Sequence, residues 1–147
     1  MLKVLIVDDE TVVRRGIVLG VDWASMDCVV VGEAANGEEG LAAAERYNPN
    51  LIITDVRMPR MDGIEMMRRL REKESTAHFI ILTAYDEFDY ARAALRYGAA
   101  DYLLKPFRDQ DLMSAIARVR EKEGAAQPAE DPLLLPKGDK SKYVLQT

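Results

Sequence analysis

The chain has 147 residues, 48% hydrophobic and 31% charged, which suits one globular domain with a core of its own and a short appendage. Its net charge of -5 provides no overall basic field for nucleic acid or an anionic membrane surface, and its longest apolar stretch is too short to cross a bilayer. The single cysteine, Cys28, excludes an internal disulfide, favours a cytoplasmic location and is expected to be a small buried hydrophobic residue.

Five short apolar runs, rich in β-branched residues, predict five β-strands. They lie at 2–7, 28–34, 51–54, 78–83 and 100–105. Because most of these runs are continuously apolar rather than alternating, they fit strands that are covered on both faces, as in a parallel sheet.

Helix-length segments separate these strands, and their apolar residues recur at spacings of three or four. These residues are Val13 and Ile17; Leu41 and Ala44; Ile64, Met67 and Leu70; Ala91 and Leu95; and Leu112, Ile116 and Val119. Strand and helix therefore alternate five times, which predicts an α/β fold with a five-stranded parallel sheet and helices on both faces. We expect the flavodoxin-like strand order 2-1-3-4-5.

The composition changes after residue 123, which sets the expected end of the domain at 1–123. Residues 124–147 are rich in Pro, Gly and Ala and predict a linker, and Asp139 is placed to begin another helix. Two interpretations stay open for this segment: the truncated start of a second domain, or a tail without function.

Polar residues follow four of the predicted strands at their carboxyl ends. Asp8 and Asp9 follow the first strand, and Asp55 follows the third. Thr83 is the last residue of the fourth strand, and Lys105 is the last residue of the fifth. In the order 2-1-3-4-5 these strand ends are neighbours at one edge of the sheet, where such folds bind ligands. We call this edge the rim and expect the five side chains to meet there.

Three carboxylates in one place repel each other, so either one keeps a proton or a cation lies among them. A small cluster of Asp oxygens suits Mg²⁺, which keeps several waters and often takes a phosphate oxygen as a further ligand. A zinc site is disfavoured because the only histidine, His78, lies far in sequence from Cys28. His78 is expected at the surface or strand edge, at the amino end of its strand.

An aspartate beside Mg²⁺, with a hydroxyl and an ammonium aimed at the same point, is suited to act as a nucleophile and form an aspartyl phosphate. Lys105 would offset charge on the transferred oxygens, and Thr83 could donate a hydrogen bond to one of them. Any one aspartate at a strand end can instead cap the next helix. Glu10 is interpreted in this structural way, as an acid in the first turn of the following helix.

The motifs VDDE, TDVRMPRMDG, ILTAYDEFDYARAAL and GAADYLLKPF, in this order, resemble the receiver domain of two-component response regulators. The resemblance covers 1–123 and implies that Asp55 is phosphorylated by a sensor histidine kinase. It also implies that Mg²⁺ is held by Asp8, Asp9, Asp55 and the backbone carbonyl of Arg57. Such a domain is a switch, not a turnover enzyme, and loses its phosphoryl group slowly by itself.

The same resemblance implies a phosphoryl-binding and switching set made of Thr83, Ala84, Lys105 and Tyr102. The Thr83 hydroxyl would move toward the phosphoryl group while the Tyr102 ring turns inward. The bond between Lys105 and Pro106 would be cis. The face formed by the fourth helix, the fifth strand and the fifth helix would then repack and could support a homodimer. Its expected exposed members are Arg92, Arg96, Tyr97, Asp101 and Arg118.

The stretches 20–41 and 85–106 resemble, more specifically, receivers that are fused to AraC-type helix-turn-helix domains. The tail KSKYVLQT resembles the opening of such a domain. The parent would then be a transcription regulator that binds DNA only through a domain missing from this chain, and no contact with a membrane is expected.

Three other functions are alternatives to a phosphorylated transcription regulator. A flavin mononucleotide binder would need a Ser/Thr/Gly-rich phosphate loop where this chain has DDETVV. A phosphatase of the haloacid dehalogenase type would have a D-x-D pattern instead of adjacent aspartates. The remaining alternative is a stand-alone receiver that acts as a protein-interaction module.

Overall fold

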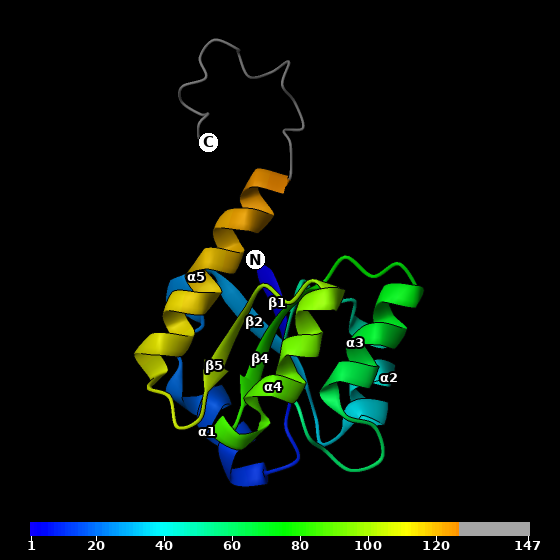
Figure 1. The fold of residues 1–147 in the computed structure, drawn as a ribbon. Helices are drawn as coiled ribbons and strands as arrows, with labels where there is room; N and C mark the ends of the chain where they lie inside the picture. The colour runs from blue at the N-terminus through cyan, green and yellow to red at the C-terminus, as the bar shows by residue number, and fades with distance from the viewer. Residues whose placement is uncertain (127–147) are drawn as a thin grey trace.

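A computed structural model describes residues 1–126, apart from the side chains of Tyr85, Phe88, Ala125 and Ala126, and its strands form one parallel sheet (Figure 1). The strands are β1 (Leu2–Val7), β2 (Cys28–Ala34), β3 (Leu51–Asp55), β4 (His78–Thr83) and β5 (Asp101–Leu104). Their order is β2-β1-β3-β4-β5, which confirms the predicted topology. The predicted linker and second-domain start over 127–147, with Asp139, lie outside the described residues.

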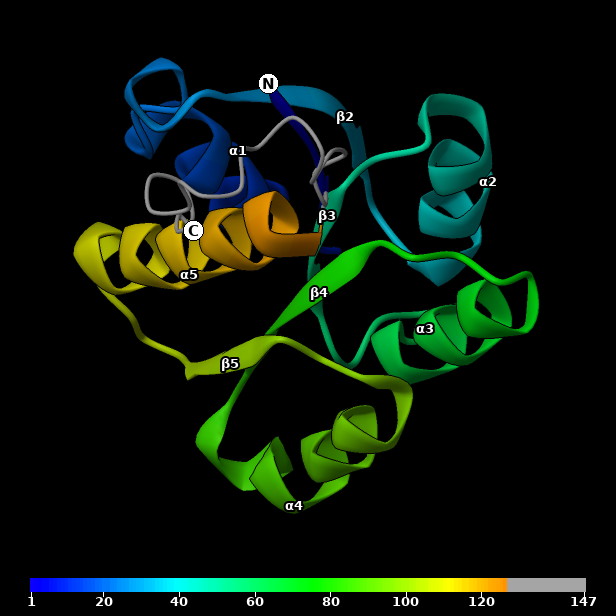
Figure 2. The ribbon, with the colours of Figure 1, turned by 90° about the horizontal axis from the view of Figure 1, so that it is seen from above.

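Helices cover both faces of this sheet. They are α1 (Thr11–Gly20), α2 (Gly37–Tyr47), α3 (Gly63–Glu72), α4 (Phe88–Ala91) and α5 (Asp109–Ala126), with 3-10 turns η1 (Ala24–Met26), η2 (Tyr85–Glu87) and η3 (Arg92–Tyr97). Figure 2 shows α1 and α5 on one face and α2, α3 and α4 on the other. Among the helices of residues 1–126, none combines the length and the apolar character that crossing a membrane requires.

The core lies in two layers because alternate residues of each strand point to opposite faces. Leu5, Ile52 and Phe79 pack toward α2, α3 and α4, whereas Ile6 and Ile53 pack toward α1 and α5. All five side chains are fully buried. This double burial explains the continuously apolar strand sequences. Cys28 is also buried, as expected, and is a free thiol.

Two helices that border the rim begin with side-chain caps. Asn36 Oδ1 accepts a hydrogen bond from the backbone N–H of Glu39 at 2.9 Å, and Asp62 Oδ1 accepts one from the N–H of Glu65 at 2.8 Å. Each cap satisfies a backbone donor that the first helical turn leaves without a partner. The caps therefore fix where the loops after β2 and β3 turn into α2 and α3.

The fourth helical segment differs from the prediction. Ala91 and Leu95 were expected to share the buried face, but Leu95 is 57% exposed and Ala94 is buried beside Ala91. The reason is that the α-helix ends at Ala91 and η3 continues with three residues per turn, which aligns positions three apart rather than four. Tyr97, expected on the exposed face, is partly buried against the core instead.

Candidate functional site

Three carboxylates meet at the rim. Asp8 and Asp9 follow β1, and Asp55 is the last residue of β3, which pairs with β1. Asp8 and Asp55 are buried and Asp9 is exposed, and a carboxylate oxygen from each lies within 4.8 Å of the other two. The parallel arrangement of β1 and β3 therefore brings together acids that are separated by nearly fifty residues in sequence.

The Asp8 carboxylate is only half satisfied by the protein. Its Oδ1 accepts a hydrogen bond from the backbone N–H of Glu10 at 2.9 Å. Its Oδ2 is the one buried side-chain oxygen or nitrogen in the described part of the chain that has no hydrogen-bond partner. Because a buried acceptor without a partner costs free energy, this oxygen suits a ligand that the protein does not itself supply. A hard divalent cation with oxygen ligands, such as Mg²⁺, fits this set, and the exposed Asp9 leaves room for its waters.

Lys105 is the cation that the fold places among these acids. Its Nζ lies 3.2 Å from Asp55 Oδ2, 3.6 Å from Asp8 Oδ2 and 3.7 Å from Glu10 Oε1. The residue follows β5, its backbone N–H donates to the Thr83 carbonyl at 2.8 Å, and its bond to Pro106 is cis. One ammonium among several carboxylates leaves the rim negative, which favours binding of a further cation.

The electrostatics of the rim perturb its ionisable groups. Burial, reinforced by the charge of Asp8, raises the pKa of Asp55 to about 6, although Lys105 opposes this shift. Burial also raises the pKa of Asp8. Desolvation lowers the pKa of Lys105, but the nearby carboxylates of Asp55 and Asp8 outweigh it and the net shift is upward. Without a metal the folded protein therefore releases the proton of Asp55 at a higher pH than the unfolded chain does.

Glu10 corrects one expectation from the sequence. It was assigned to the first turn of the first helix, but α1 begins at Thr11 and Glu10 is the residue before it, in extended backbone. From there its carboxylate reaches Lys105. Glu10 thus belongs to the charge network of the rim. The sequence alone did not indicate this, because a helix start can be predicted only to within one or two residues.

Thr83 and Tyr102 sit on adjacent strands but in different environments. Thr83 is fully buried and its hydroxyl donates to the carbonyl of Ala84 at 3.2 Å. Tyr102 lies on β5 and is 42% exposed. The two residues sit on paired strands, with Tyr102 opposite Ile81 and Thr83 opposite Leu104. The Thr83 side chain is therefore enclosed by the protein, whereas the Tyr102 side chain is partly open to solvent.

The Arg57 side chain contacts the segment that follows β4. It is 63% exposed, its Nε lies 3.2 Å from Glu87 Oε2, and its guanidinium lies 5.0 Å from the centroid of the Tyr90 ring. The Tyr90 hydroxyl donates in turn to Asp62. Tyr90 and Asp62 were not selected from the sequence, although the spacing of Asp62 and Glu65 is a helix-start signal that marks Asp62.

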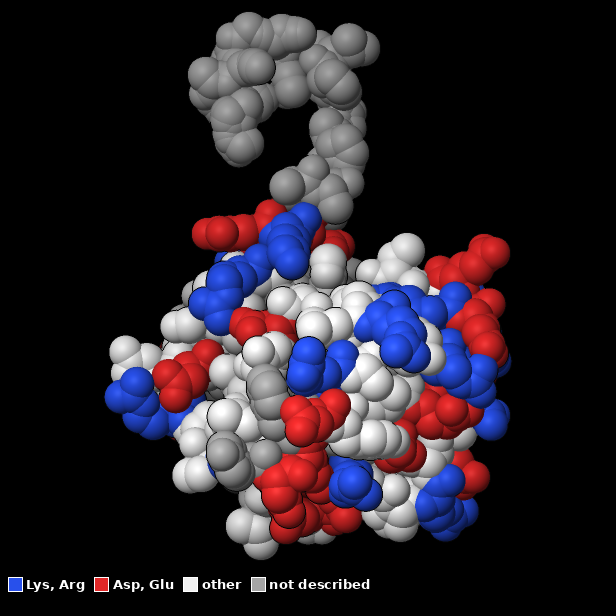
Figure 3. Space-filling model, in the orientation of Figure 1, with Lys and Arg blue, Asp and Glu red and all other residues white. Residues whose placement is uncertain are grey.

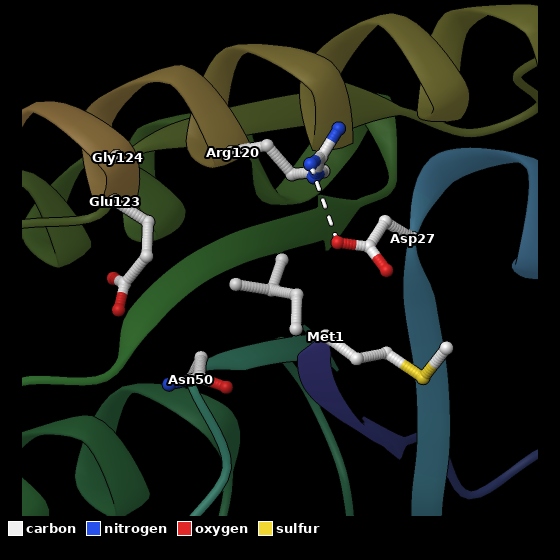
Figure 4. A pocket seen from close by; sticks show the side chains of 7 residues that line it. Met1, Asp27, Asn50, Arg120, Glu123 and Gly124 are labelled. Carbon is white, nitrogen blue, oxygen red and sulfur yellow. Dashed lines mark ion pairs between the residues drawn. The ribbon is translucent and has the colours of Figure 1, made fainter.

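A second concave region lies at the opposite, amino edge of the sheet. This pocket of about 220 Å³ is lined by Asp27, Asn50, Arg120 and Glu123, among others (Figure 4). Its charged groups pair within the protein: Arg120 lies 3.6 Å from Asp27, and Glu123 lies 2.9 Å from the Nε2 of His78, a partly buried residue at the amino end of β4. Such pairing is typical of a structural contact between α5 and the sheet.

The surface charge agrees with a site at the carboxyl edge. In Figure 3 acidic side chains gather toward the lower edge of the view, where the strands end, and Lys and Arg side chains are more frequent toward the top. On the face seen in this view, acidic side chains are therefore numerous near the edge at which the strands end.

Comparisons with known proteins place this geometry in context. The model of the response regulator receiver domain matches residues 4–117. The chain is 35% identical over 119 residues to the uncharacterized transcriptional regulatory protein YesN of Bacillus subtilis; the match covers 81% of this chain and 32% of YesN. The chain thus spans about a third of the length of this curated relative.

Two solved structures show the same architecture. The receiver domain of AraT, a response regulator from Geobacillus stearothermophilus, is 44% identical with a TM-score of 0.82, covering 86% of this chain and 98% of that one. A two-component transcriptional regulator AraC from Clostridium phytofermentans is 30% identical with a TM-score of 0.80, covering 87% of this chain and 99% of that one.

Proposed function

The chain belongs to the response regulator receiver domain family, whose members are signalling switches, and we propose that it accepts a phosphoryl group on Asp55 from a sensor histidine kinase. The observation that carries the proposal is the rim itself: the oxygens of Asp8, Asp9 and Asp55 gather within 4.8 Å of one another, with Lys105 beside them. No single strand could assemble this set.

In the proposed reaction a carboxylate oxygen of Asp55 attacks the phosphorus atom of the donor. The new oxygen–phosphorus bond forms as the bond to the imidazole nitrogen breaks, and that nitrogen keeps the electron pair and takes up a proton. Asp8, Asp9, Asp55 and the backbone carbonyl of Arg57 would hold Mg²⁺, which when bound supplies positive charge near the transferred oxygens. Acetyl phosphate would serve as a small-molecule donor.

The other rim residues respond to the new charge. Lys105, already 3.2 Å from Asp55, would pair with a phosphoryl oxygen. The Thr83 hydroxyl would exchange its bond to the Ala84 carbonyl for one to a second phosphoryl oxygen, with Ala84 beside the group. Tyr102 would then turn into the space that Thr83 leaves, so that the face of α4, β5 and α5 repacks.

Labelling with acetyl phosphate tests the proposal. In the presence of Mg²⁺ we expect the intact mass to rise by one phosphoryl group, and we expect Asp55→Asn or a metal chelator to abolish the gain. Asp27→Asn is the matched control, because Asp27 lies at the amino edge of the sheet and should leave labelling unchanged (Figure 4). Labelling that survives Asp55→Asn would contradict the assignment of the acceptor.

We further propose that the switch acts in the cytoplasm of its cell and controls an output domain of the AraC-type helix-turn-helix class, which would bind DNA. YesN is named as a transcriptional regulatory protein and the Clostridium phytofermentans protein as a two-component transcriptional regulator AraC, and both support this proposal. The chain would take part in DNA binding only through that domain.

The face of α4, β5 and α5 is the proposed surface for phosphorylation-dependent homodimers. It exposes Tyr102 and Leu104 of β5 and, in the η3 turn that continues α4, Leu95. Its ion pair between Arg118 and Asp101 is formed within one chain. We expect sedimentation velocity to show a larger species when beryllofluoride and Mg²⁺ are added. A sedimentation coefficient that stays unchanged, at protein concentrations well above those used for labelling with acetyl phosphate, would count against a dimer of this domain.

A further inference from the structure

Four side chains connect the loop after β3 to the segment after β4. The Tyr90 hydroxyl donates a hydrogen bond to Oδ2 of Asp62. The Arg57 guanidinium lies over the Tyr90 ring and pairs with Glu87 at 3.2 Å. Arg57 and Asp62 belong to the segment that follows Asp55, and Glu87 and Tyr90 to the segment that follows Thr83. The cluster thus ties together the two segments that leave the rim.

The contact between Tyr90 and Asp62 is the stronger part of this cluster. The Asp62 carboxylate is held in place because its other oxygen caps α3. A hydroxyl bound to a carboxylate makes a charge-assisted hydrogen bond. The bond to Asp62 accordingly raises the pKa of Tyr90 to about 12. The pair between Arg57 and Glu87 adds little by itself, because Arg57 is mostly exposed.

The far end of the same segment is held differently. The partly buried Arg71 of α3 donates from Nε to the carbonyl of Tyr97 at 2.7 Å, and from Nη1 to the carbonyls of Ser75 and Ala77 at 2.9 and 2.8 Å. Its guanidinium also lies 4.9 Å from the centroid of the Phe79 ring. Segment 85–97 is therefore bound at its far end by one hydrogen bond from a partly buried guanidinium, which the carbonyls of Ser75 and Ala77 hold in place, and at the rim end mainly by one solvent-accessible hydroxyl.

We propose that Arg57, Asp62, Glu87 and Tyr90 form a latch that stabilises the unphosphorylated arrangement of segment 85–97 and opens when the phosphoryl group is bound. The inference rests on the proposed function. If Thr83 and Ala84 move toward a group on Asp55, Glu87 and Tyr90 move with them, because they follow within seven residues of Thr83. Arg57 and Asp62 stay with the loop and α3. The latch therefore favours one of two states, and removing it shifts the population toward the other.

Tyr90→Phe removes the hydroxyl and keeps the ring under Arg57. The full chain with this change should bind beryllofluoride, in the presence of Mg²⁺, about 2- to 10-fold more tightly, which is the range for one lost hydrogen bond in the competing state. Binding would be followed by amide NMR, and the signals of residues 84–97 in the free variant should shift toward their positions in the bound form. Glu87→Gln should tighten binding less, by about 2-fold or under.

Tyr47→Phe is the matched control. Tyr47 ends α2 and is 37% exposed, close to the 40% of Tyr90, and should leave the affinity unchanged. Equal or weaker beryllofluoride binding by Tyr90→Phe, even with a lower melting temperature, would overturn the latch and reduce the contact to a structural one. If the wild-type chain itself fails to bind beryllofluoride with Mg²⁺, the proposed phosphoacceptor function fails instead.

Discussion

Asp55→Asn is expected to raise the free energy of unfolding of the metal-free protein by about 2 to 3 kcal/mol at pH 7, because the pKa of Asp55 rises from 3.8 to about 6 on folding. An acid with a raised folded-state pKa holds its proton more tightly when folded. The protonated Asp55 side chain therefore contributes its full stabilisation when the pH is below its pKa in the unfolded chain, near 3.8. That stabilisation is lost as the pH rises through its pKa in the folded protein, about 6. At pH 7 the wild type therefore carries a buried charge that the amide lacks.

Urea unfolding in chelator-treated buffer from pH 4 to pH 7 would measure this difference. The two proteins should be nearly equally stable at pH 4 and diverge as the pH rises. Adding Mg²⁺ at pH 7 should then stabilise the wild type more than Asp55→Asn, because the ion binds the folded carboxylate cluster. Parallel stability profiles across this pH range would contradict the assigned burial of the Asp55 charge.

Gly63→Ala should damage both stability and labelling. A Cβ atom at Gly63 would lie 2.2 Å from the backbone carbonyl oxygen of Asp55 and 3.2 Å from the Oγ1 of Thr54. The first contact is with backbone, so the end of β3 or the start of α3 has to move, at a cost of about 3 kcal/mol. Because the displaced carbonyl belongs to Asp55, labelling by acetyl phosphate should slow in the fraction that stays folded.

Gly16→Ala is the matched control for this substitution. Gly16 lies in α1, and a Cβ atom there would meet no atom within 4 Å. Alanine is the better helix former, so this change should stabilise the protein by about 0.5 to 1 kcal/mol and leave labelling intact. Chemical unfolding of the two variants would decide: equal stabilities would mean that the close approach of α3 to β3 is not a constraint.

The strands could be predicted almost to the residue, because the three central strands β1, β3 and β4 are buried on both faces and their apolar runs begin and end close to the strand ends. The largest departure is β5, which starts one residue after the predicted run and ends before Lys105. The meeting of Asp8, Asp9 and Asp55 also followed from the strand order, since parallel neighbours end at one edge.

Features that depend on the exact helix geometry were harder to predict. The exposure of Leu95 follows from a change to three residues per turn after Ala91. The sequence has apolar residues both three and four positions after Ala91, at Ala94 and Leu95, so it is compatible with either helix type there. The reach of Glu10 to Lys105 depends on which residue begins α1. The contact of Tyr90 in α4 with Asp62 at the N-cap of α3 joins residues 28 positions apart, which no local pattern encodes.

The rim takes its groups from the first, third, fourth and last strands, and Lys105 follows the last of them. A polypeptide still emerging from the ribosome, or cut before β5, thus has its aspartates without the lysine that faces them. If Asp55 is the phosphoacceptor, as proposed, the chain becomes able to receive the phosphoryl group only when the final strand joins the sheet. Phosphorylation would in that case be restricted to fully folded chains, and incomplete chains would transmit no signal.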